Sequence, residues 1–142
     1  MSSDDLFLSE QHPRSKRWAI VEDDGAVAWM YLTGRDSRKP VADCWLYNRV
    51  QAPPVFQPQR GTAPLVPATH VVDSSSVEPP SPDQVRFKWS PDGESVGVHF
   101  ETDVIGFIAA GQQRGFSRNL SKKGPFGSPI DRDLYERLFG AP

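Results

Sequence analysis

The chain has 142 residues, a formal net charge of −2 and a single cysteine. This length predicts one domain, and the near-neutral charge argues against a protein that holds nucleic acid by releasing counterions. A lone cysteine excludes an internal disulfide. Because no apolar run approaches the ~20 residues of a membrane helix and no secretory signal is recognisable, we expect a soluble cytoplasmic protein without membrane contact.

We divide the chain into a flexible N-terminal arm at residues 1–17 and a single β-rich domain at residues 18–142. The arm is predicted because its residues are polar apart from a short apolar run at residues 6–8.

The domain begins with a predicted β-hairpin. Asp24-Gly25 lies between two stretches of alternating apolar residues, and this pattern is a strong short-range signal for a hairpin turn. A two-residue loop there pairs Glu22 with Val27 and Trp18 with Tyr31. Both faces are apolar, so we expect the hairpin to be covered on two sides. One face carries Trp18, Ile20, Val27, Trp29 and Tyr31, and the other carries Ala19, Val21, Ala28, Met30 and Leu32.

A third strand is predicted at residues 41–50, after a polar turn at residues 33–40. Alternation assigns its residues to two faces that both contain apolar side chains. One face carries Val41, Asp43, Trp45, Tyr47 and Arg49, and the other carries Ala42, Cys44, Leu46, Asn48 and Val50.

Residues 51–84 form a proline-rich segment that holds eight of the 14 prolines, so regular secondary structure is not expected there. The segment could be a disordered insertion, a linker between two small subdomains, or an extended strap that crosses the surface. We favour the strap, with residues 70–72 as a possible short edge strand and a mobile serine run at residues 74–76. Four apolar side chains give the strap something to bury: Leu65, Val66, Val71 and Val72.

A second hairpin is predicted around Asp92-Gly93. We favour a four-residue loop at residues 90–93, which pairs Phe87 with Val96, because proline and glycine in this order suit a type I turn followed by a left-handed residue. The two-residue alternative pairs Trp89 with Val96 and keeps the same faces. The face that includes His99 is expected to be solvated, whereas the apolar face carries Val85, Phe87, Trp89, Val96, Val98 and Phe100.

Helix and strand compete over residues 103–120. Gly106, Gly111 and Gly115 would each destabilise a helix by up to ~1 kcal/mol relative to alanine. We therefore predict a third hairpin with Gln112-Gln113 at its turn.

A C-terminal helix is predicted from its capping residues. Ser128 suits the N-cap, Pro129 the first helical position and Asp131 the third, and Gly140 follows the last turn. Its apolar stripe, which we expect to dock on the sheet, is formed by Ile130, Leu134, Tyr135, Leu138 and Phe139.

These elements predict a mainly β fold, either an antiparallel sandwich or a partly open barrel of about six or seven strands, with one C-terminal helix. The alternative is an α+β domain in which residues 103–120 are helical.

The sequence predicts no catalytic residue, metal site or cofactor. The three histidines, His12, His70 and His99, lack the spacing of metal ligands. Cys44 lies between apolar neighbours, which favours a buried core thiol over a nucleophile. The carboxylates of Glu22-Asp23-Asp24 gather at the predicted hairpin tip, where we expect them to be solvated.

A basic segment before the C-terminal helix is the candidate ligand site. Free amides at a helix N-terminus favour an anion, and the segment brings cations and a serine toward one. The purely structural explanation of these residues, which we favour, is a turn that points Phe126 into the core and then caps the helix. The candidate anion-binding residues are Arg114, Arg118, Lys122, Lys123 and Ser128.

The high aromatic content and the missing catalytic motifs favour a protein–protein interaction module, of an accessory, regulatory or inhibitor-neutralising kind and of bacterial type. Its expected partner is another protein or a second copy of the chain. The alternative is binding of an anion or single-stranded nucleic acid through residues 114–123, although aromatic and basic side chains do not share a strand face as a nucleic-acid platform requires. A third hypothesis is a small-molecule enzyme of the β-barrel kind, acting through Glu101, Asp103 or His99.

Overall fold

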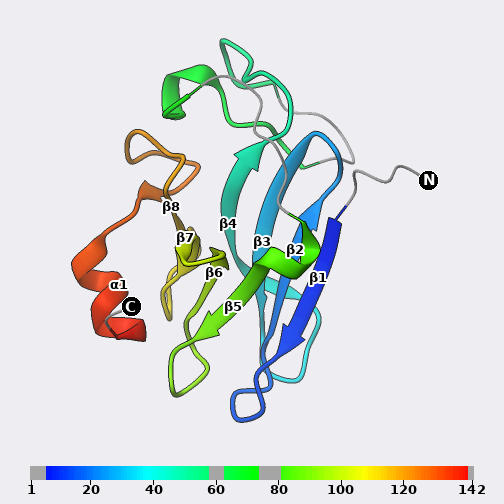
Figure 1. The fold of residues 1–142 in the computed structure, drawn as a ribbon, viewed down its shortest axis with the longest axis vertical. Coiled ribbons are helices and arrows are strands. Elements are labelled where there is room, and N and C mark those ends of the chain that lie inside the picture. Colours follow the sequence, from blue (N-terminus) through cyan, green and yellow to red (C-terminus); the bar gives the residue numbers. More distant parts are fainter. Residues whose placement is uncertain (1–5, 58–62, 74–80, 141–142) are drawn as a thin grey trace.

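The computed structural model describes residues 6–57, 63–73 and 81–140. Two β-sheets pack face to face, and one helix covers the outer face of the second sheet (Figure 1). The first sheet is antiparallel and consists, in spatial order, of β1 (Leu6–Gln11), β2 (Trp18–Asp23), β3 (Val27–Thr33) and β4 (Pro40–Asn48). The second consists of β5 (Val85–Trp89), β6 (Val96–Phe100), β7 (Asp103–Ile108), β8 (Phe116–Ser117) and β9 (Ser128–Pro129). With α1 (Arg132–Phe139) at the end, the predicted mainly β sandwich with one C-terminal helix is confirmed.

The segment at residues 103–120 is a hairpin, so the α+β alternative is wrong. Strand β7 pairs antiparallel with β8. The turn is centred on Gly111, whose φ of +80° suits glycine, and the amide of Gln112 donates to the carbonyl of Ala109 over 3.1 Å. The turn therefore lies slightly before the predicted position.

The two sheets are joined along one edge at Asp43. Its amide donates to the carbonyl of Gln113 (3.0 Å), and its carbonyl accepts from the amide of Gly115 (2.8 Å). Strand β4 therefore continues its hydrogen bonding into the loop between β7 and β8, and the sandwich is closed on this side.

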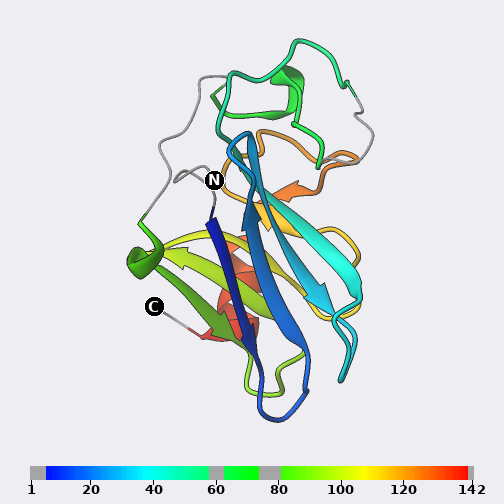
Figure 2. The same ribbon diagram turned by 90° about the vertical axis from the view of Figure 1, so that its right-hand side faces the viewer.

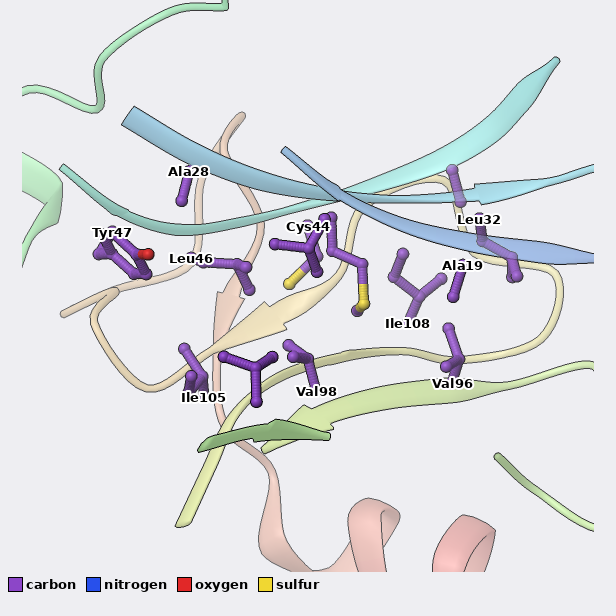
Figure 3. Close-up of a cluster of buried hydrophobic side chains, with 14 of the residues drawn as sticks. Ala19, Ala28, Leu32, Cys44, Leu46, Tyr47, Val96, Val98, Ile105 and Ile108 are labelled. Carbon is purple, nitrogen blue, oxygen red and sulfur yellow. The ribbon is translucent and has the colours of Figure 1, made fainter. Parts of the chain in front are cut away.

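The main hydrophobic core lies between the sheets (Figure 3). The first hairpin contributes the predicted face that begins with Ala19, and the second hairpin contributes its predicted apolar face, so both assignments of residues to faces are confirmed. Buried members of this core are Ala19, Val21, Ala28, Met30, Leu32, Cys44, Leu46, Val85, Val96, Val98, Ile105 and Ile108.

The register of the first hairpin differs from the prediction by two residues: Asp23 pairs with Ala28, and Ile20 with Tyr31. The loop is Gly25-Ala26, because the carboxylate of Asp24 accepts from the two amides that follow this glycine, at 2.9 and 3.0 Å, and draws the turn one residue further along. The shift is even, so every side chain stays on its predicted face.

The second hairpin also has the predicted faces and a different register. Trp89 pairs with Val96, and the four-residue loop begins at Pro91 instead of Ser90. Ser90 is held in the ladder because its amide donates to the carbonyl of Ser95 over 2.9 Å. The turn itself is as predicted, with the amide of Gly93 donating to Ser90 and φ of +73° at that glycine.

A β-bulge in β4 overturns part of its predicted alternation. Trp45 pairs with Trp29, but the preceding residue of β3 pairs with Tyr47, so Leu46 is the extra residue. Leu46 and Tyr47 consequently both belong to the core between the sheets, and Asn48 joins Trp45 on the outer face through a 3.1 Å hydrogen bond. The predicted assignment of β4 side chains to the two faces is therefore correct up to Leu46 and wrong for the residues after it.

The prediction of a flexible arm at residues 1–17 is wrong for the part that the structure describes; residues 1–5 lie outside it. Strand β1 pairs along its length with β2, and His12 and Ser15 in the turn that follows are buried. The His12 ring lies 5.2 Å from the ring of Trp89 and accepts from nearby backbone amides. Alternation missed β1 because four of its six side chains are exposed and three of these are polar, as on an edge strand.

Helix α1 begins later than predicted. Its N-cap is Asp131, whose carboxylate accepts from the amide of Leu134 over 3.1 Å, whereas Ser128 and Pro129 form β9 beside β8. The apolar stripe docks on β7 as expected, around a cluster of Phe107, Tyr135 and Phe139. The supposedly solvated face of the second hairpin is therefore partly covered.

Candidate functional site

Residues 51–57 and 63–73 of the proline-rich strap lie on the outer face of the first sheet. Val66 is fully buried there, and its backbone exchanges two hydrogen bonds with the amide side chain of Asn48. The indole of Trp29 donates to the carbonyl of Pro64 over 3.0 Å. These contacts hold residues 63–73 against β3 and β4. The serine run at residues 74–76 lies outside the described residues.

Residues 70–72 do not form the predicted edge strand. A short 3-10 turn spans Ala68–His70, and Val71 then forms a single antiparallel bridge with Leu120. Val71 is buried, whereas Val72 is exposed. The strap thus lies beside the loop after β8 at one end of the molecule, as Figure 2 shows.

A pocket of about 630 Å³ lies between the strap, the outer face of the first sheet and the loop before β9. We call it the strap pocket. Its wall is mainly aromatic and proline rings. The sheet contributes Trp29 and Tyr31, the strap Phe56, and the loop Phe126; the prolines are Pro54, Pro64, Pro67 and Pro125.

Ring contacts organise the strap side of the pocket. The centroids of Phe56 and Phe126 lie 5.5 Å apart, and His70 meets Phe126 edge-on at 5.2 Å. The Nδ1 atom of His70 lies 2.8 Å from the hydroxyl of Thr69. Phe126 therefore faces the strap and the pocket, as well as the cluster on the outer face of the sheet.

The polar end of the strap pocket is an ion pair. Arg114 donates from Nη1 to Oδ2 of Asp43 over 2.7 Å and from Nε to the carbonyl of Pro125 over 3.1 Å. The Oδ1 atom of Asp43 is buried without a hydrogen-bond partner among the described residues. Burial raises the pKa of Asp43, and the neighbouring guanidinium opposes this shift.

Tyr31 lies directly opposite Asp43 on the adjacent strand. Burial raises the pKa of Tyr31 to about 12, and the carboxylates of Glu22, Asp43 and Asp24 contribute in the same direction. The sheet end of the pocket is therefore an acidic environment.

The candidate anion-binding residues are not gathered at one helix N-terminus. Arg114 lines the strap pocket, whereas Arg118 lies 3.9 Å from Asp103 in a separate, smaller cleft beside α1. Lys122 and Lys123 are exposed on the intervening loop. Ser128 belongs to β9, because the helix begins four residues after it and is capped by the carboxylate of Asp131.

The residues of the enzyme hypothesis have separate environments. The Nε2 atom of His99 lies 2.6 Å from the hydroxyl of Tyr135, and burial, followed by the charge of Lys88, lowers the pKa of His99. Glu101 accepts from the side chain of Gln84 over 2.9 Å. Asp103 lines the small cleft beside α1, which neither of the other two lines.

The single cysteine is part of the hydrophobic core. Burial raises the pKa of the Cys44 thiol, which is enclosed in the core. Within the described ranges, no group of three or more His, Cys, Asp or Glu side chains could hold a metal ion.

The acidic hairpin tip contains a buried ion pair that sequence reasoning missed. Glu22 and Asp24 are exposed as expected, but Asp23 is 1% exposed. Its carboxylate accepts from the hydroxyl of Tyr47 over 3.0 Å and lies 3.1 Å from Nη1 of Arg49. The prediction that the three carboxylates at this tip are solvated is therefore wrong for Asp23.

Comparisons with known proteins add no further information about this site: no family model, curated protein or solved structure matches the chain. The part of the chain that the structure describes contains no helix with the length and apolar character of a membrane span.

Proposed function

We propose that this protein is a protein-binding module whose partner inserts apolar side chains into the strap pocket. The observation that carries the proposal is an aromatic pocket bordered by exposed apolar side chains. Val55 and Phe56 line the pocket and are nevertheless 62% and 44% exposed. Protein interfaces typically use such a recess for a buried apolar group and surround it with further contact area.

The chemistry of the pocket wall supports binding over catalysis. Its polar groups include an ion pair already made between Asp43 and Arg114, the mutually bonded Thr69 and His70, and the hydroxyl of Tyr31, whose raised pKa disfavours a reactive phenolate. A volume of about 630 Å³ is within the usual range for bound groups of several side chains or a small molecule. The exposed rim favours a protein partner, because it extends the apolar surface beyond the cavity.

A capture experiment with matched variants tests the proposal. The wild-type chain, Phe56→Ala and Phe7→Ala are immobilised and incubated with extract of the source organism, and retained proteins are identified by mass spectrometry. Phe7 is the control because it is 61% exposed on β1 and does not line the pocket. We expect one partner protein on the wild type and on Phe7→Ala, and its loss from folded Phe56→Ala. Equal retention by all three variants, or no specific protein on the wild type, contradicts the proposal.

A further inference from the structure

The wall of the strap pocket is formed largely by aromatic rings. The rings of Trp29 and Tyr31 belong to the sheet, and those of Phe56 and Phe126 come from the opposite wall. The indole N–H of Trp29 is already engaged with the strap, so ring contact is the main attraction that this wall offers. Aromatic grooves of this kind suit a proline-rich segment, since an extended polyproline helix loses little entropy on binding.

One flank of the same pocket is acidic. On the sheet face, Glu22 lies opposite Trp29, and Asp43 lies opposite Tyr31. Asp24 at the hairpin tip also raises the pKa of Tyr31, although it does not line the pocket. Arg114 compensates the charge of Asp43, so the negative charge beside the aromatic wall comes mainly from Glu22. Lys122 and Lys123 are exposed on the loop that carries Phe126, and neither lines the pocket.

We infer that the partner segment is proline-rich and basic, with proline rings against the aromatic wall and an arginine or lysine beside Tyr31 and Glu22. The inference rests on the proposed function and adds the chemical class of the partner. A cation at that position meets the carboxylate of Glu22 and the ring of Tyr31, and both contacts favour it. An acidic segment would instead be repelled by the carboxylate of Glu22.

A pair of synthetic peptides tests the charge. Both are blocked hexapeptides of five prolines and a final charged residue, which is arginine in one and glutamate in the other. Binding is followed by calorimetry and by tryptophan fluorescence. We expect the arginine peptide to bind about five- to tenfold more tightly at low salt, and the ratio to fall toward one at roughly 0.5 M salt as screening increases.

Variants connect the result to the pocket. Glu22→Gln changes a residue outside the pocket lining and should reduce the ratio, whereas Asp43→Asn releases Arg114 and should shift the preference toward glutamate. Phe56→Ala should weaken both peptides, whereas Phe7→Ala leaves the aromatic wall intact and should weaken them much less, since Phe7 lies opposite Glu22 and outside the pocket lining.

Equal affinities, or tighter binding of the glutamate peptide to the wild type, overturn the inferred charge. No binding of either peptide at millimolar concentration overturns the proline-rich class. In both cases the capture experiment still decides the proposed function separately, because a partner protein with another docking sequence would be retained there.

Discussion

Asp23→Asn removes the negative charge from a fully buried ion pair, and we expect it to lower the free energy of unfolding by about 3 kcal/mol. The Asp23 side chain is 0% exposed and that of Arg49 is 11% exposed, so the ion pair that is lost is largely shielded from water. The substitution also weakens the hydrogen bond from Tyr47, because a charged acceptor becomes a neutral one.

Urea denaturation followed by tryptophan fluorescence measures this loss, and thermal unfolding should show a fall in Tm of roughly 6–12 °C for a domain of this size. Asp24→Asn is the matched control at the same hairpin tip. Asp24 is exposed, and the side-chain oxygen of asparagine can still accept from the amides of Ala26 and Val27. Its effect should stay within ~0.5 kcal/mol.

A double variant separates the lost charge from other effects. When Asp23→Asn is combined with Arg49→Met, we expect the loss of stability to be at least ~1 kcal/mol smaller than the sum of the two single losses, because each single substitution already breaks the same ion pair. The reasoning is refuted if Asp23→Asn is at least as stable as Asp24→Asn, or if the two single losses simply add in the double variant.

Three further predictions concern packing, capping and ionisation. Gly115→Ala should destabilise the fold by about 2 kcal/mol in chemical denaturation, because the new Cβ would lie 2.6 Å from Cβ of Cys44; a loss below ~0.5 kcal/mol contradicts this contact. Asp131→Ala should cost about 1 kcal/mol and Ser128→Ala clearly less, and the reverse order would place the cap where the sequence suggested it. The pKa of Tyr31 is raised by burial and nearby carboxylates from 10.0 to about 12, so its contribution to stability is complete below pH ~10 and is lost as the pH rises toward about 12. Near-ultraviolet titration and stability measurements on wild type and Tyr31→Phe check this, and identical alkaline profiles would count against it.

Alternation predicted the faces of the hairpins because face depends only on parity. The register depends on where a turn closes, and at the first tip this is decided by the carboxylate of Asp24 bonding to amides ahead of it. In β4, apolar residues on both faces gave no sign of the bulge at Leu46. The edge strand β1 was missed because only one side of it is buried, and then only in part.

The strap pocket could not be predicted from spacing. Trp29, Phe56 and Phe126 come from three distant parts of the chain and meet only when the strap folds over the sheet. The available signal was weak: single aromatic residues beside prolines in two loops, Pro54-Val55-Phe56 and Pro125-Phe126, where a polar composition is usual. Arg114, which the sequence predicts as an anion-binding residue, lines the strap pocket as the partner of Asp43, and this ion pair was not foreseen.

Site-specific photo-cross-linking tests the central claim most directly. A benzoylphenylalanine is placed at position 56 or, as the control, at position 7, and each chain is irradiated in cells of the source organism. If the strap pocket is where a partner protein docks, position 56 yields a discrete adduct of higher mass and position 7 does not. No adduct at position 56, or the same adducts at both positions, would contradict it.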